Sequence, residues 1–230
     1  EKLPPPKQPS SSNKLPIFIG VVVALLLATV VWFTQKPSDT TPLKEEAFAT
    51  EVIPTENNPV DLGLSVKWAA YNVGASSPEE YGGLYGWADP TGEKKATNSN
   101  DSLSGTPPFN ISDTQYDIAR AKWGEKWRLP TQQELKELSD KCIWKWTEYK
   151  KVAGYMVTGP NGNRIFLPAS GYCYAYGGTV YGRGRNGRYW SGTRKTASSS
   201  ASSLVFSING WSPLYSDYCK EGNSVRPVSE

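Results

Sequence analysis

The longest apolar run of the chain lies near its start, from Ile17 to Phe33. It contains no charged side chain and a single hydroxyl, that of Thr29. With the two residues before it, the run is just long enough to cross a bilayer as a helix, for which about 17 residues is the lower limit. We therefore expect an uncleaved transmembrane anchor over residues 15–35. A cleaved signal peptide is the alternative, although its nearest small-residue site, Ala47–Ala49, lies well beyond the run.

The segments on either side of this run predict how the chain is placed about the membrane. Residues 1–14 carry three lysines and residues 36–58 carry two, and the side richer in basic residues faces the cytoplasm. We expect a cytoplasmic or juxtamembrane tail, a single-pass anchor in the cell membrane, and the rest outside the cytoplasm, in the periplasm or at the cell surface. Residues 36–58 are polar and interrupted by proline, which is typical of a flexible stalk.

From residue 59 onward the pattern is that of one folded domain, residues 59–230. Val60–Trp68 alternates in the way a strand does. Two capping boxes follow, in which a Ser or Thr is paired with a Gln or Glu three residues later. They predict helices that open at Ser112 and at Thr131, and in the second helix Leu135 and Leu138 lie on the inner face.

Beyond the second helix the sequence predicts strands and loops only. Tyr155–Thr158 and Arg164–Leu167 flank a Gly-Pro-Asn-Gly turn and form a hairpin. The last strand is expected at Ser224–Val228, beside Val60–Trp68. A strand, then two helices, then a loop-rich β half indicates an α+β fold, with two helices packed on a twisted, mostly antiparallel sheet.

The amino-acid composition excludes several classes of catalytic and metal-binding site. The chain has no histidine, which excludes Ser-His-Asp and Cys-His catalysis and the commonest zinc ligand. Cys142, Cys173 and Cys219 allow at most one internal disulfide, and whether any pair forms is left open. The loop 98–108 is polar like a calcium loop, but Phe109 stands where a closing Glu is needed. We predict no metal, no cofactor and no catalytic residue.

Five blocks of the sequence carry a resemblance to a known family. In chain order they are VDLGLSVKWAAYNVGASSPEEYGG, KWGEKWRLPTQQELKEL, GYMVTGPNGNRIFLPASGY, YWSGT and SVRPV. They resemble the Fibrobacter succinogenes major paralogous (FISUMP) domain, which is abundant in surface and secreted proteins of Bacteroidetes, and they span about residues 60–228. The resemblance implies a C-type-lectin-like fold with its termini close together, and it implies no established reaction.

The C-terminal third is also similar to the variable proteins of diversity-generating retroelements, which display a diversified binding face on the same fold. Mutation of adenines in AAY codons in such systems gives Tyr, Ser, Asn, Asp, Gly, Arg, Ala or Cys. Tyr172–Tyr176 and Ser198–Ser203 fit this alphabet, whereas Lys195 and Trp211 do not, and active diversification stays an open alternative. The Glu-Pro-Asn and Trp-Asn-Asp motifs of calcium-dependent sugar-binding lectins do not occur.

The charge pattern points to the same part of the chain. Residues 149–216 contain no acidic side chain and eight basic ones, so that the remainder of this chain of net charge +3 carries −5. Residues 172–190 alone hold five Tyr, five Gly and three Arg. This is the composition of an antibody paratope, and arginine adds bidentate contacts to carboxylate or phosphate. The predicted ligand-binding residues, expected to lie exposed on one face, are Tyr174, Tyr176, Tyr181, Arg183, Arg185, Arg188, Trp211, Tyr215 and Tyr218.

We therefore expect a recognition or adhesion protein that binds a protein or an anionic glycan, with the membrane as its second partner. Nucleic acid is not expected, since a domain outside the cytoplasm seldom meets it. The alternative is a hydrolase or transferase of the cell envelope that uses carboxylates and tyrosines. Its candidate acids, Asp89, Asp101 and Asp113, show no pairing in the sequence. The apolar residues of the same stretch are expected in the core: Trp190, Leu204, Val205, Phe206 and Ile208.

Overall fold

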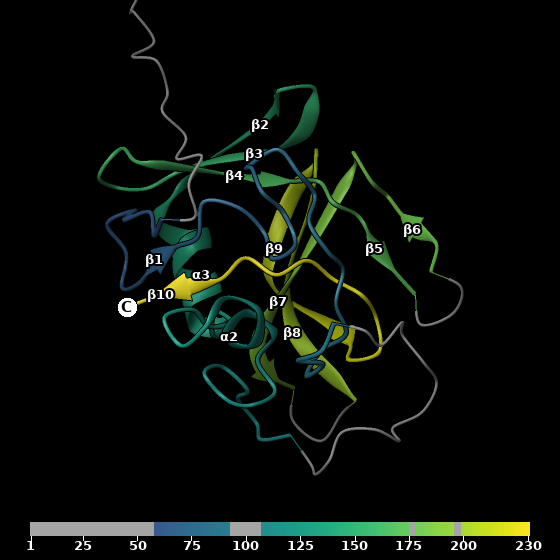
Figure 1. The fold of residues 1–230 in the computed structure, drawn as a ribbon. Coiled ribbons are helices and arrows are strands. Elements are labelled where there is room, and N and C mark those ends of the chain that lie inside the picture. The colour runs from purple at the N-terminus through teal and green to yellow at the C-terminus, as the bar shows by residue number, and fades with distance from the viewer. Residues whose placement is uncertain (1–57, 93–106, 175–177, 196–198) are drawn as a thin grey trace, which may run out of the picture. The chain divides into compact units, whose positions relative to one another are not determined.

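The computed structural model describes residues 58–92, 107–174, 178–195 and 199–230 (Figure 1). The chain divides into two units, residues 1–51 and 52–230, and every described residue belongs to the second. The expected anchor therefore lies outside the described residues, as does the expected stalk except for its last residue. Within the described part, no helix is long and apolar enough to cross a bilayer.

The described domain has more strand than helix, and two short helices precede most of the strands, which confirms the predicted α+β class. The helices are α2 (Ile118–Trp123) and α3 (Gln132–Lys141). The strands are β1 (Lys67–Trp68), β2 (Ile143–Tyr149), β3 (Val152–Thr158), β4 (Arg164–Pro168), β5 (Tyr172–Cys173), β6 (Val180–Tyr181), β7 (Asn186–Arg194), β8 (Ser200–Ser207), β9 (Gly210–Tyr218) and β10 (Val228–Ser229).

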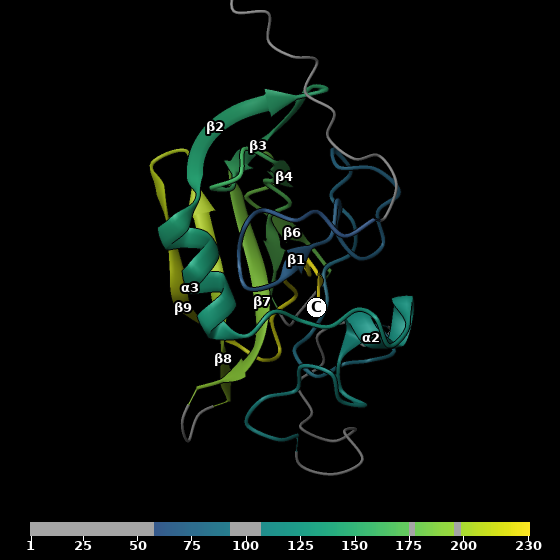
Figure 2. The same cartoon turned by 90° about the vertical axis from the view of Figure 1, so that its left-hand side faces the viewer.

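Two three-stranded antiparallel sheets, β2–β3–β4 and β7–β8–β9, enclose the larger part of the core. Helix α3 lies along one face of the β7–β8–β9 sheet (Figure 2). Its Leu135 and Leu138 are buried there, as the sequence predicts, and they belong to the same core cluster as Tyr155 and Phe206. The predicted β3–β4 hairpin is also confirmed, since Thr158 pairs with Arg164 across the turn.

The two ends of the domain meet, as predicted. In the β1–β10 pair Trp68 lies opposite Val228, and the backbone N–H of Val73 donates to the carbonyl oxygen of Val225. The predicted strands at these ends are nevertheless too long, because only Lys67–Trp68 and Val228–Ser229 form a ladder. Pro227 interrupts the second segment, since it has no N–H to donate.

The first predicted capping box is wrong, and the second is confirmed. Helix α2 begins at Ile118, because the carboxylate of Asp117 caps it by accepting from the N–H groups of Ala119 and Arg120. The Ser112 hydroxyl donates to Asn110 instead, and Asp113 has a positive φ of 63° that no helix accommodates. In α3, Thr131 and Glu134 form the full reciprocal box.

Arg226 joins three segments in the centre of the domain. Its side chain is 1% exposed, and Nη2 donates to the Phe166 carbonyl in β4. Nη1 donates to the carbonyl oxygens of Ala69 and Ala70, and Nε donates to the side-chain oxygen of Asn72. Among the described residues no acid pairs with it, and burial lowers the pKa of the guanidinium to about 10. The arginine of the SVRPV block is thus a structural clamp.

Candidate functional site

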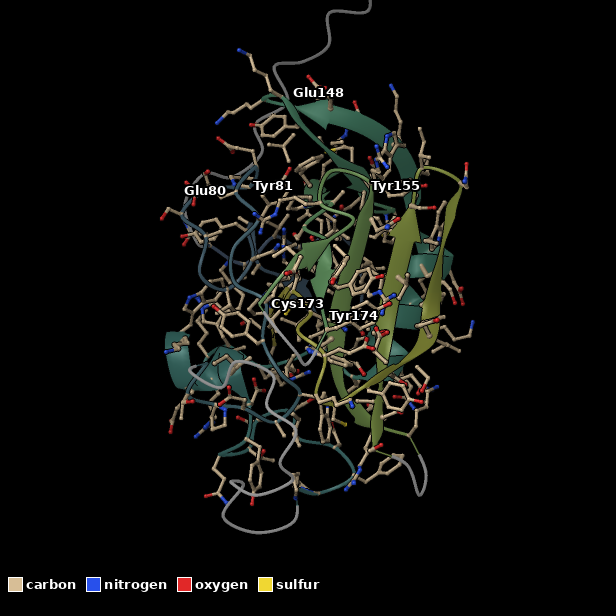
Figure 3. All side chains as sticks on the ribbon, turned by 90° about the vertical axis from the view of Figure 1, so that its right-hand side faces the viewer. Glu80, Tyr81, Glu148, Tyr155, Cys173 and Tyr174 are labelled. Atoms are coloured by element: carbon tan, nitrogen blue, oxygen red, sulfur yellow. The ribbon has the colours of Figure 1, made fainter. Side chains whose placement is uncertain are left out.

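Three tyrosines in mutual contact, and a fourth that approaches the same arginine as one of them, lie on the face of the β7–β8–β9 sheet that α3 leaves free. We call Tyr172, Tyr174, Tyr181 and Tyr215 the tyrosine row. The ring centroids of Tyr174 and Tyr181 are 5.1 Å apart, and Tyr172 lies 5.3 Å from Tyr174 and 6.1 Å from Tyr181. Tyr174 stands in front of this sheet beside Cys173 (Figure 3). All members except Tyr172 are exposed, so the row presents rings and hydroxyls to solvent.

Short strands and glycines bring these rings together. Strands β5 and β6 pair antiparallel with Tyr172 opposite Tyr181, which places the two side chains on one side of the ribbon. Gly171 precedes the ribbon with a φ of +75°, and a Cβ there would lie 2.4 Å from the Tyr181 carbonyl oxygen. Only glycine fits this position. The glycine-rich composition of the region therefore serves to fold the ribbon tightly onto β7.

Arg188 of β7 lies under the row and does not extend into solvent. Its guanidinium carbon is 3.5 Å from the ring centroid of Tyr172 and 5.7 Å from that of Tyr215. Nη1 donates to Asp217 at 2.5 Å and to Glu221 at 3.0 Å. The side chain is only 15% exposed. The expectation that Arg188 is an exposed contact residue is therefore wrong, because two acids hold it against the sheet.

The two acids are themselves buried, with Asp217 2% and Glu221 7% exposed. The second oxygen of Asp217 accepts from the Ser203 hydroxyl at 2.6 Å and from the Asn223 amide at 2.9 Å. Burial raises the pKa of Glu221 to about 7, and the neighbouring charge of Asp217 adds to the increase. One arginine and two carboxylates thus carry a net charge of −1 when both acids are ionised.

An open groove of about 480 Å³ adjoins the row. It runs along the turn between β8 and β9, with Tyr172 and Arg188 on one side and Trp211 on the other. Asn186, Asn209 and small hydroxyl residues contribute the remaining polar groups. Arg188 is its only charged lining residue, and the acid pair neutralises that charge. The groove therefore offers hydrogen-bonding groups and ring surface without a free cation.

The structure brings some predicted site residues together and separates others. Tyr174, Tyr181, Arg188 and Tyr215 belong to the row or support it. Arg183 and Arg185 are exposed on the turn between β6 and β7, and the Arg183 guanidinium lies 4.8 Å from the ring centroid of Tyr81. Trp211 stacks on Trp144 at 5.0 Å, and its indole N–H donates to Ser139 of α3. Tyr176 lies outside the described residues.

The expectation of a single face is wrong for Tyr218 and for Trp211, which opposes Phe206 and donates to Ser139 on the α3 side of the sheet. Residues directly opposite in an antiparallel pair point to the same side of the sheet, and successive residues alternate. Tyr215 opposes Ser203 and shares the side of Arg188. Tyr218 opposes Ser200 and therefore shares the side of Ser202, whose hydroxyl donates to Gln132 of α3. Although Tyr218 is exposed, it faces away from the row.

The other polar candidates do not form a reactive site in the described part of the chain. The carboxylate of Asp89 accepts from Thr91, Asp113 pairs with Arg120, and Asp101 lies outside the described residues. Cys142, Cys173 and Cys219 are all free thiols. Burial raises the pKa of Cys142 and of Cys219 to about 11, which leaves both unreactive at neutral pH. Among the described residues, no cluster of acids and thiols could hold a metal ion.

Three residues of the candidate site are not among the predicted ones: Tyr172, Asp217 and Glu221. Asp217 is the first acid after a stretch of 68 residues without one, and Glu221 follows four positions later. This isolated pair, placed directly after the basic stretch, is a signal that marks both acids, although it does not show which basic residue they pair with. Of the expected core residues, Trp190, Leu204 and Phe206 are buried, Val205 is half-buried, and Ile208 is 64% exposed beside the β8–β9 turn.

Comparisons of the chain with protein-family models, with curated proteins and with solved structures gave no match. The resemblance to the FISUMP domain stays a prediction from the sequence.

Proposed function

We propose that this protein is a recognition protein whose tyrosine row and adjoining groove bind a protein or an anionic glycan. The observation that carries the proposal is the row itself: Tyr172, Tyr174 and Tyr181 are in mutual ring contact, and the exposed Tyr215 approaches the same guanidinium as Tyr172. Tyrosine offers a large contact area, a hydroxyl and few rotatable bonds, so that binding costs little conformational entropy. A sheet holds such side chains more rigidly than a loop does, which lowers this cost further.

Two arginines next to the row favour a ligand with negative charge. Arg183 and Arg185 are exposed, and the acids nearest to the row are buried beneath it. An acidic group on the ligand would therefore meet two cations at the edge of the surface. The carboxylates of Asp217 and Glu221 would not repel it at close range, because they are buried beneath the row. Because both arginines are solvated, their contribution falls as salt rises.

The ring surface is tested by the double variant Tyr174→Ala, Tyr181→Ala. Peptides selected from a random short-peptide display library on the unmodified domain are expected to bind this variant far more weakly. Loss of one tyrosine hot spot costs on the order of 2 kcal/mol, or about thirty-fold in affinity. Titration calorimetry with three or more selected peptides provides the measurement. Tyr218→Ala is the matched control, since Tyr218 is even more exposed than Tyr174 and Tyr181 but lies on the opposite side of the sheet.

Selected peptides that bind the double variant and the parent domain equally well would place recognition elsewhere. Denaturation curves of all variants distinguish a lost contact from a lost fold, because exposed substitutions usually change the free energy of unfolding by no more than about 0.5 kcal/mol.

The proposal extends to the cellular setting. The domain is displayed outside the cytoplasm by an anchor over Ile17–Phe33, and the FISUMP resemblance supports a C-type-lectin-like fold for it. If so, the protein is expected to stay in the membrane fraction after carbonate washing, and protease added to spheroplasts is expected to digest the domain. A mature N-terminus at Thr50 would instead identify a secreted protein with a cleaved leader.

One observation favours the alternative, an envelope hydrolase or transferase. Glu221 has the near-neutral pKa that a general acid needs, and Asp217 lies beside it. We favour recognition because both carboxylates are buried and their oxygens already accept from Arg188, Ser203 and Asn223. A substrate would have to displace these donors before it met an acid.

A further inference from the structure

Beneath the tyrosine row lies a cluster of three charged side chains, two carboxylates and one guanidinium. Arg188 sits between Asp217 of β9 and Glu221, which follows β9, and its planar guanidinium packs on the ring of Tyr172 from β5. Tyr215, two positions before Asp217, approaches the same guanidinium from β9. One side chain therefore contacts two of the four rings, which come from different strands.

We propose that Arg188 is a positioning residue for Tyr172 and Tyr215. When Glu221 takes up a proton, Arg188 holds these two rings less firmly. The inference rests on the proposed function, in that it takes the tyrosine row as the contact surface. With both acids ionised, two charged hydrogen bonds fix the plane of the guanidinium. When Glu221 takes a proton from solvent, one of these two ion pairs is lost and only Asp217 still holds Arg188 by charge.

The geometry makes Glu221, among these groups, the one that titrates. Asp217 has a full set of donors, namely Arg188 on one oxygen and the Ser203 hydroxyl and Asn223 amide on the other. Glu221 accepts from Arg188, and it is buried beside Asp217, whose charge and whose hydrogen bond with the Glu221 carboxyl group both favour the protonated form of Glu221. The resulting rise of its pKa to about 7 places the change near neutral pH.

Other charged and titratable groups lie near Glu221, but none of them replaces Glu221 as the group that takes up the proton. Lys220 opposes the rise in the pKa of Glu221, and Arg188 does so more strongly. Cys173 of β5 lies near enough for Glu221 to raise the pKa of its thiol, although burial is the main cause. The hydrogen bond with Tyr174 raises the pKa of Tyr172 above its ordinary value of 10, so that Tyr172 stays protonated through the neutral range.

The proposal is tested without any ligand, by NMR of the domain with ring-labelled tyrosines, from about pH 5 to about pH 9. The ring signals of Tyr172 and Tyr215, assigned by Tyr→Phe variants, are expected to shift with a midpoint near pH 7. The ring of Tyr71, which packs on Trp123 at 5.8 Å, is the internal control and is expected to stay constant.

Two variants separate positioning from a general effect on the fold. Glu221→Gln mimics the protonated acid, and its Tyr172 and Tyr215 signals are expected to match those of the parent at low pH and not to titrate. Arg188→Lys keeps the charge but loses the planar stack on Tyr172, so the ring signals of Tyr172 are expected to differ from those of the parent at every pH while those of Tyr71 stay unchanged.

The outcomes are distinct. Constant Tyr172 and Tyr215 signals in the parent, or an unchanged titration in Glu221→Gln, overturn the positioning role. If the titration is found but the Tyr174→Ala, Tyr181→Ala variant still binds every selected peptide, the device is real and the proposed function fails. If that variant loses peptide binding but the parent shows no titration, the proposed function holds and the positioning role of Arg188 fails.

Discussion

Replacing Arg226 with methionine is expected to lower the free energy of unfolding by about 4 kcal/mol or more. Methionine fills a similar volume but donates no hydrogen bond. Four acceptors would then lose a donor: the carbonyl oxygens of Ala69, Ala70 and Phe166 and the side-chain oxygen of Asn72. An unsatisfied buried polar group costs about 1–3 kcal/mol. A domain of ordinary stability, about 5–15 kcal/mol, would lose much of its native population.

The prediction differs from the known result that a buried ion pair can be replaced by apolar residues at little cost. There, both partners are removed together. The partners of Arg226 are mainly backbone groups, which no substitution removes. Urea denaturation of Arg226→Met measures the loss, and Arg185→Met, at an exposed arginine, is the control that should change stability by no more than about 0.5 kcal/mol. A loss below about 1 kcal/mol would mean that water takes over the role of the guanidinium.

The sequence predicts those elements whose signals are local. The Thr131 capping box, the apolar spacing of Leu135 and Leu138, and the β3–β4 turn each occupy a few adjacent residues, and all are confirmed. The Ser112 box is equally local but wrong. Asp117 accepts from Leu129 and Asp113 as well as from α2, and this combination with a segment twelve residues away outweighs the local signal.

The candidate site is predicted less well because its character depends on contacts between distant strands. Composition points to the stretch that carries Tyr174, Tyr181 and Tyr215, and these three side chains are exposed. It cannot show that Arg188 pairs with acids 29 and 33 residues later, since such pairing depends on the register of β7, β8 and β9. Nor can it place Trp211 on the opposite side from Tyr215, because a bulge between Ser203 and Val205 changes the count along β9.

The three arginines of the paratope-like stretch are therefore expected to behave differently. Arg183→Ala with Arg185→Ala should leave stability nearly unchanged, because both side chains are exposed. Retention on immobilised heparin, used as an anionic probe, is expected to fall in this variant at low salt and to match that of the parent at high salt. Equal retention of variant and parent at every salt concentration would remove the two arginines from the binding surface.

Arg188→Ala, in contrast, is expected to lower the free energy of unfolding by about 3 kcal/mol, since removal of one partner leaves charge buried without compensation. Asp217 and Glu221 would face each other with no cation between them.

The loss of stability in Arg188→Ala should grow as pH rises. The raised pKa of Glu221 means that its contribution to stability is present below pH 4.5 and is lost as pH rises through about 7, and the loss becomes larger once Arg188 no longer offsets the charge. Urea denaturation at several pH values measures this, and adding Glu221→Gln to Arg188→Ala should recover part of the stability above neutral pH. A single variant as stable as the parent at every pH would show that the acids find other partners, and Arg188 would then be free to contact a ligand.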